Sequence, residues 1–146
     1  MSDEAIVKES RIAVPYTWSA GETGSRFLKT LRDEQKIVGT RCPDCKNVFV
    51  PARKTCGRCF KECAEWLDVG PQGKLVSFTR ANYESPAHPV SQPWYGLIRL
   101  DGADNSILHL LGELSEDGPQ PGMTVEPVFS EERCGHILDI RYFKPV

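Results

Sequence analysis

The chain has 146 residues, of which 40% are hydrophobic and 26% charged, a composition typical of a folded globular domain and not of a disordered chain. No apolar run approaches the roughly 20 residues that a membrane-spanning helix needs. The first ten residues are acidic and polar and lack the apolar stretch of a secretory signal. From these features we expect a cytoplasmic protein that neither spans a membrane nor is secreted.

The net charge of −2 is distributed unevenly along the sequence. Residues 36–61 hold seven bases and one acid, whereas the rest of the chain holds 11 bases and 19 acids. A basic segment of this kind suits nucleic acid, a phosphorylated ligand such as coenzyme A, or an acidic partner. The acidity of the whole chain argues against nucleic acid, because domains that bind nucleic acid are typically basic.

The predicted elements begin with a flexible N-terminal extension, residues 1–21. It contains a short alternation of apolar residues, which suits an extended segment that adds itself to a partner: Ile12, Val14, Tyr16 and Trp18. From Glu22 the apolar spacing becomes helical, with Phe27, Leu28 and Leu31 on one face. Because this apolar stripe is narrow, we expect Phe27 and Leu31, together with Phe60, to be exposed on a docking surface.

A cysteine-rich segment follows the helix. Cys42-Pro-Asp-Cys45 and Cys56-Gly-Arg-Cys59 are two CxxC pairs separated by ten residues, and two such pairs can hold one zinc ion in a tetrahedron of four thiolates. Iron would accept the same ligands, and a redox CxxC is the other alternative. We predict a zinc site whose four protein ligands leave no open position, so that it is structural and not catalytic. The predicted metal ligands are Cys42, Cys45, Cys56 and Cys59.

The remaining cysteines and histidines do not form a recognisable catalytic motif. Cys63 is expected to be a spare or buried thiol, and Cys134 a thiol buried in a strand, although His136 lies two positions away. We expect His88 to be solvated in a loop and His109 to be half-buried in a strand. Motifs for a serine nucleophile, a metalloprotease or a phosphate-binding loop are absent from the sequence. The sequence therefore predicts that the chain is not an enzyme by itself.

Short strands are predicted after the cysteines, with no helix between them. Turns rich in Gly and Pro separate them, and residues 84–94 form a loop with three prolines. The pattern favours a small closed antiparallel barrel over a parallel α/β sheet. The predicted strands are 66–69, 74–83, 95–100, 107–114, 123–129 and 135–143.

Taken in order, these motifs resemble the DUF35 family of OB-fold proteins associated with acyl-CoA. The resemblance covers roughly residues 22–145, and it implies a mainly β fold. In this fold an N-terminal helix and a rubredoxin-like zinc ribbon (22–66) precede a five-stranded OB-fold barrel (67–146). The motifs that carry it are Arg41-Cys-Pro-Asp-Cys45, Phe49-Val-Pro-Ala-Arg53, Cys56-Gly-Arg-Cys59, Gly70-Pro-Gln-Gly73, Gly96-Leu-Ile-Arg-Leu-Asp101 and Phe143-Lys-Pro145.

The resemblance also implies a function. It suggests a non-catalytic subunit of a hetero-oligomeric thiolase-type complex that cleaves or forms C–C bonds of acyl-CoA, in which a thiolase-fold partner supplies the catalytic residues. The small subunit would scaffold that partner and border the site of the coenzyme A thioester. Degradation of aromatic compounds, such as benzoylsuccinyl-CoA thiolysis, is the favoured setting. The alternatives are a stand-alone acyl-CoA-binding module and, less favoured, a protein that binds single-stranded nucleic acid.

Overall fold

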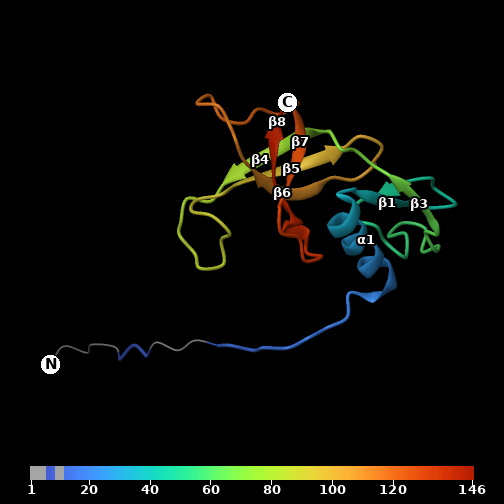
Figure 1. Ribbon diagram of the computed structural model, residues 1–146, viewed down its shortest axis with the longest axis horizontal. Helices are drawn as coiled ribbons and strands as arrows, with labels where there is room; N and C mark the ends of the chain where they lie inside the picture. Colours follow the sequence, from blue (N-terminus) through green and yellow to red (C-terminus); the bar gives the residue numbers. More distant parts are fainter. Residues whose placement is uncertain (1–5, 9–11) are drawn as a thin grey trace.

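The computed structural model describes residues 6–8 and 12–146, and it places one helix and a small sheet beside a barrel (Figure 1). The predicted extension 1–21 is described only in part, because residues 1–5 and 9–11 lie outside the described residues. The described residues 12–20 belong to no helix or strand. The elements are α1 (Gly21–Glu34), β1 (Val38–Arg41), β2 (Val48–Phe49), β3 (Glu65–Asp68), β4 (Gly73–Arg80), β5 (Trp94–Leu100), β6 (Ile107–Leu111), β7 (Thr124–Phe129), the short 3-10 helix η1 (Ile137–Asp139) and β8 (Ile140–Pro145).

Helix α1 forms where the apolar spacing predicts it, but its apolar face is buried. Phe27 is 3% exposed and Leu31 is fully buried, so the prediction that both lie on a docking surface is wrong. The narrow stripe is sufficient because α1 contacts β1 and η1, which cover it from two sides. Arg133 holds the C-terminal end of the helix, where its Nε donates to the carbonyl of Arg32 at 2.8 Å and its positive charge suits the helix dipole.

A three-stranded antiparallel sheet carries the cysteines, in the order β2-β1-β3. Thr40, in the central strand, is fully buried. Its hydroxyl accepts from the backbone N–H of Arg53 and donates to the carbonyl of the same residue, both at 2.8 Å. This pair of bonds fixes the chain between the two CxxC turns against the middle of the sheet.

The remaining strands close into a barrel in the order β4-β5-β6-β8-β7, with β7 returning to β4. All pairs are antiparallel except β6 with β8, which is parallel. Gly73 pairs with Leu100 on one side and Val125 on the other, and a Cβ there would lie 2.5 Å from the carbonyl oxygen of Arg99. Only glycine lets the strands approach this closely. This topology is that of the OB fold, which confirms the predicted barrel.

The end of the chain differs from the prediction of one strand over 135–143. Strand β8 begins only at Ile140, and η1 precedes it. The cause is Asp139, which is 3% exposed and whose carboxylate accepts from the backbone N–H groups of Cys134, Gly135 and His136 at 3.1, 2.8 and 3.2 Å. These three bonds fold residues 134–139 into a tight turn in place of an extended strand.

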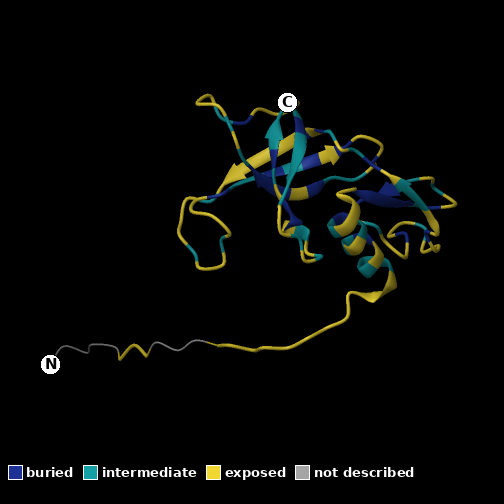
Figure 2. Cartoon of the chain, viewed as in Figure 1, coloured by how far each residue is buried: buried dark blue, intermediate teal, exposed yellow. Residues whose placement is uncertain are grey.

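The cysteine-bearing sheet and the barrel share one hydrophobic core. Figure 2 shows buried residues on the strands of the cysteine-bearing sheet as well as inside the barrel. One hydrophobic cluster joins Val48 and Val50 of this sheet to barrel residues such as Leu100. At this junction the N–H of Val48 donates to the carboxylate of Asp104, and the amide of Asn105 bonds both the N–H and the carbonyl of Val50, at 2.7–2.8 Å. The division into 22–66 and 67–146 stays a prediction.

None of the helices in the described part of the chain is both long and apolar enough to span a membrane.

Candidate metal centre

Four cysteines converge beside β1. Their Sγ atoms all lie within 4.8 Å of one another, and the Sγ atoms of Cys45 and Cys56 are 3.7 Å apart. Cys42 and Cys56 are fully buried, whereas Cys45 and Cys59 are partly exposed. Within residues 6–8 and 12–146, no other group of three or more Cys, His, Asp or Glu side chains comes together in this way. The structure therefore brings together the four cysteines that the spacing predicts as ligands.

The first CxxC turn is fixed by its backbone. The N–H of Cys42 donates to the carbonyl of Asn47 at 2.9 Å, and the N–H of Lys46 donates back to the carbonyl of Cys42 at 3.1 Å. Lys46 takes a left-handed conformation, with φ of 64°, which reverses the chain. Cys42 and Cys45 are thereby held on the same side of the turn.

The second CxxC turn repeats the same pattern. Cys56 donates to the carbonyl of Lys61 at 2.9 Å, Phe60 donates to the carbonyl of Cys56 at 3.0 Å, and Phe60 is left-handed with φ of 57°. The N–H groups of Arg58 and Cys59 also point at the Sγ of Cys56, both at 3.4 Å. The two turns are thus equivalent halves that face each other, an arrangement that suits a tetrahedral metal site.

The two thiols of the second CxxC turn differ strongly in acidity. The backbone N–H of Cys59 lowers the pKa of Cys56 to about 7, against the effect of burial. A hydrogen bond with Cys45, together with burial, raises the pKa of Cys59 to about 12. Four thiolates this close repel one another, so a bound divalent cation is what allows all four to lose their protons. This donor set fits zinc, which the site would hold as a closed tetrathiolate.

Cys63 does not join the four-sulfur group. It is 3% exposed, and its Sγ lies 3.9 Å from the carbonyl oxygen of Lys61. Burial raises the pKa of this thiol, which keeps it protonated and neutral. The expectation of a buried thiol is confirmed.

Cys134 is exposed, so the prediction of a thiol buried in a strand is wrong. It lies in the turn organised by Asp139, whose carboxylate is 3.8 Å from its Sγ. His136 does not face this thiol as a base, because its Nδ1 accepts from the N–H of Leu138 at 3.1 Å and so caps η1. The sequence separation of two residues gives no catalytic pair here.

The other two histidines lie apart. His109 is 5% exposed, more deeply buried than the predicted half-buried position. Its Nδ1 accepts from the N–H of Leu110 at 2.9 Å, so its Nε2 donates to the carbonyl of Ile137 at 3.2 Å. Burial lowers the pKa of His109, and the neutral ring serves to fix β6 to η1. His88 is partly exposed in the proline loop, with its ring centre 4.9 Å from that of Tyr83.

Most of the bases in segment 36–61 lie on the surface without a salt bridge to any described residue. Lys36 pairs with Glu34 at 3.2 Å and Arg41 with Glu65 at 2.7 Å. The other five make no salt bridge with any residue that the structure describes: Lys46, Arg53, Lys54, Arg58 and Lys61. All five are exposed, so the ribbon presents a positively charged surface.

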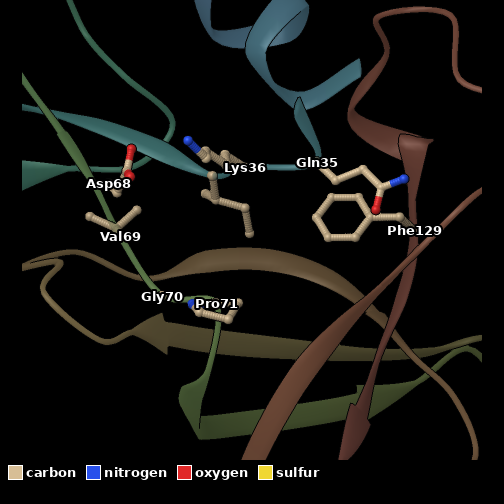
Figure 3. Close-up of a pocket in the computed structure, with 8 residues that line it drawn as sticks. Gln35, Lys36, Asp68, Val69, Gly70, Pro71 and Phe129 are labelled. Atoms are coloured by element: carbon tan, nitrogen blue, oxygen red, sulfur yellow. The ribbon is translucent and has the colours of Figure 1, made fainter. Parts of the chain in front are cut away.

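A hollow of about 220 Å³ lies where α1, the ribbon and the barrel meet (Figure 3). Gln35 and Phe129 lie side by side along one wall, and Gly70 and Pro71 form the opposite one. Lys36 is the only base among the lining residues and Asp68 the only acid, and the figure shows the Lys36 amine directed away from the hollow. The lining residues offer no pair of nucleophile and base.

Comparisons with known proteins agree with this geometry. A family model described as the ChsH2 rubredoxin-like zinc ribbon domain matches residues 30–62. A curated relative, a DUF35 domain-containing scaffold protein of Methanocaldococcus jannaschii, is 24% identical over 131 residues, covering 83% of this chain and 89% of that protein.

Two solved structures share the fold. A chain of the Ltp2-ChsH2(DUF35) aldolase superposes with a TM-score of 0.65 at 17% identity, covering 84% of this chain and 93% of that chain. A DUF35-family protein of unknown function from Sulfolobus solfataricus superposes with a TM-score of 0.60 at 23% identity, covering 74% of this chain and 78% of that chain. The likeness therefore extends over both the ribbon and the barrel.

Proposed function

Because the chain belongs to the DUF35 family and carries a rubredoxin-like zinc ribbon, we propose that it is a non-catalytic accessory subunit of a thiolase-type acyl-CoA complex. Its role is to scaffold a thiolase-fold catalytic subunit and to border the site where the coenzyme A thioester enters. The reaction of the complex is cleavage or formation of a C–C bond in an acyl-CoA. Degradation of aromatic compounds, such as benzoylsuccinyl-CoA thiolysis, is the setting that we favour.

The observation that carries this proposal is the closed cysteine cluster. We assign Cys42, Cys45, Cys56 and Cys59 as the zinc ligands, since their Sγ atoms lie within 4.8 Å of one another. Four protein ligands fill the tetrahedral zinc shell and leave no position for water or substrate. The metal then stabilises the ribbon, and the catalytic groups come from a partner.

The names of the relatives support a hetero-oligomer. One relative is a scaffold protein, and the name of a solved aldolase joins ChsH2, a DUF35 protein, to Ltp2. One relative that is a scaffold and one that is part of an aldolase support an accessory role more strongly than an independent activity. All six cysteines lie in the described part of the chain and none of them forms a disulfide, which suits a reducing cytoplasm.

The charge of the ribbon supports an anionic ligand or partner surface. Arg53 and Arg58, with Lys46, Lys54 and Lys61, are exposed bases without a salt bridge to any described residue. Arginine binds phosphate in a bidentate fashion, which suits the phosphates of coenzyme A. The same observation favours the alternative of a stand-alone acyl-CoA-binding module.

A tagged copy purified from its native host tests the proposal. After a salt wash, we expect a thiolase-fold protein at near-stoichiometric yield by mass spectrometry. A matched chain with Arg53→Glu and Arg58→Glu should keep its zinc but weaken binding of coenzyme A to the complex by at least about tenfold, because two phosphate-binding charges are reversed.

Calorimetric titration of the chain alone with coenzyme A separates the two functions. The subunit proposal predicts weak or no binding in the absence of the partner. Tight binding by the isolated chain, with no thiolase-fold protein captured, would favour the stand-alone module. Steeply salt-dependent binding of single-stranded oligonucleotide would favour the nucleic-acid alternative.

A further inference from the structure

An apolar groove of about 270 Å³ runs across the barrel between β5, β6, the proline loop and η1. Neither Lys nor Arg lines it, and its surface is mainly apolar. Leu108 is 66% exposed and Leu138 is 43% exposed, which is unusual for leucine on a folded domain when the two meet in one hollow. The main lining residues are Pro89, Tyr95, Leu108, Leu110, Ile137 and Leu138.

The chemistry of the groove favours an apolar chain over a charged ligand. Both ring nitrogens of His109 are already engaged, one by the N–H of Leu110 and one by the carbonyl of Ile137. Strands in this part of an OB fold and the loops beside them commonly bind oligonucleotides, but such binding needs positive charge along the groove. The lining contains no Lys or Arg, and its second histidine, His136, uses its Nδ1 to accept the N–H of Leu138. A segment with apolar side chains is therefore the better occupant.

The chain itself carries a segment of this kind. Four apolar side chains alternate along residues 12–18, so in an extended segment they lie on one side. Their exposed fractions are 89% for Ile12, 68% for Val14, 75% for Tyr16 and 74% for Trp18. The segment leads away from the N-terminal end of α1 and is exposed along its length (Figures 1 and 2). Its side chains therefore lie outside the groove of their own chain.

The area available indicates how two copies would join. A buried aromatic side chain contributes about 150–250 Å². The segment inserts two aromatic and two aliphatic side chains, so the segment and the groove that receives it bury about 1,000 Å² when both surfaces are counted. A stable interface needs about 1,200–2,000 Å². One contact is therefore too small, whereas two equivalent contacts related by a twofold axis exceed this requirement.

We propose that the chain forms a twofold homodimer in which residues 12–18 of each copy occupy the apolar groove of the other. The aromatic rings of Tyr16 and Trp18 cover Leu108 and Leu138, and both apolar surfaces leave water. This dimer is a property of the chain alone and does not rest on the proposed accessory function.

Sedimentation equilibrium of the full chain tests the dimer. Trp18→Ser and Leu108→Ser should each raise the dimer dissociation constant by at least about tenfold, since each removes a central apolar contact. The matched controls are Thr17→Ala, which changes the opposite side of the segment, and Val146→Ser, which changes an exposed residue outside the groove. Both controls should dimerise like the unaltered chain. At a concentration low enough for every chain to be monomeric, all four variants should melt at the same temperature, since association stabilises a folded chain only where the dimer forms.

Mixing the Trp18→Ser and Leu108→Ser chains distinguishes a segment that binds the groove of the other copy from a segment that folds back into the groove of its own chain. A pair made of one Trp18→Ser chain and one Leu108→Ser chain retains one intact contact, so a tagged copy of one should capture the other more efficiently than it captures its own kind. A chain that is monomeric at all concentrations, or a dimer that ignores both substitutions, would overturn the proposal. Neither result bears on capture of a thiolase-fold partner, which is measured separately.

Discussion

The ribbon and the barrel reach stability by different means. The ribbon strands β1, β2 and β3 have four, two and four residues. Around the CxxC turns, the buried side chains are Phe49 and three cysteines. The barrel strands have five to eight residues and close around fully buried side chains such as Leu75, Ile98 and Phe143. We therefore expect the CxxC turns of the ribbon to depend on metal coordination. The barrel, and the ribbon face with Val48 and Val50 that packs on it, depend on apolar burial.

The largest effect is expected from Cys42→Ser. Structural zinc contributes about 10–16 kcal/mol in isolated zinc-finger peptides, so loss of a fully buried ligand should release the metal and expose residues 38–66 to hydrogen exchange. Zinc content and exchange mass spectrometry measure both. The control, Cys134→Ser, should keep one zinc per chain because that thiol is exposed and outside the cluster. If Cys42→Ser retained stoichiometric zinc and normal protection, the assignment of the ligand would be wrong.

A core substitution in the barrel should lower the free energy of unfolding without releasing the metal. Phe143 is fully buried, and Phe143→Ala should lower the free energy of unfolding by about 3–5 kcal/mol through lost burial and a residual cavity. Urea unfolding measures the change, while the folded protein should still bind one zinc. Val146→Ala, at a residue that is 70% exposed, should change it by less than about 0.5 kcal/mol. Loss of zinc from folded Phe143→Ala would show that the two regions are not stabilised separately.

The junction should give an intermediate effect. Asn105→Ala removes two hydrogen bonds to the backbone of Val50 and leaves buried groups without partners, at a cost of about 1–3 kcal/mol. Hydrogen exchange in β2 should accelerate more than exchange in β7. Asn82→Ala, at an exposed loop residue, is the matched control. Equal acceleration in both strands would mean that Asn105 stabilises the whole chain and not the contact between its regions.

The smallest effect is expected at Asp139, through pH. Burial alone would raise its pKa, but the N–H groups of Cys134, Gly135 and His136 outweigh burial and hold the pKa below the ordinary value. Its contribution to stability is therefore complete above the unfolded pKa of about 3.9 and declines as the pH falls through the folded pKa. We expect Asp139→Asn to cost about 1 kcal/mol at pH 7.

Urea unfolding at pH 7, 5 and 3 measures the difference in free energy of unfolding between the unaltered chain and Asp139→Asn. Acid releases zinc from both chains alike, so this release cancels in the difference. The difference should be equal at pH 7 and 5 and smaller at pH 3. A difference that grows toward low pH would contradict the hydrogen-bonding role of the ionised carboxylate.

Local patterns in the sequence predict the cluster and the barrel well, because both depend on short-range spacing. Two CxxC pairs ten residues apart specify four converging thiols, and alternating strands with glycine turns indicate a barrel. The structure places Phe27 and Leu31 in the core, although the narrow stripe suggested exposure. The helix packs on β1, which follows it directly in the chain, and also on η1, which lies about 100 residues further along. Burial of a helix face depends on such contacts, which one sequence does not reveal.

The turn at 134–139 is a second feature that the sequence pattern did not predict. Alternation around Ile137 resembles a strand, but one buried carboxylate at Asp139 gathers three backbone donors and bends the chain instead. The acidic residue just before the apolar residue Ile140 was the available signal. The apolar groove has no sequence signature at all, because Pro89, Leu108 and Leu138 come from three separate segments.

The accessory role is tested most directly by reconstitution. The thiolase-fold protein captured with the tagged chain would be purified alone, then assayed for acyl-CoA thiolysis with and without this chain, beside the chain by itself. We expect no thiolysis by the chain alone and a clear increase in the partner's rate when the chain is added. Thiolysis by the chain alone, or a partner whose rate is unchanged by its addition, would show that the chain is not an accessory subunit.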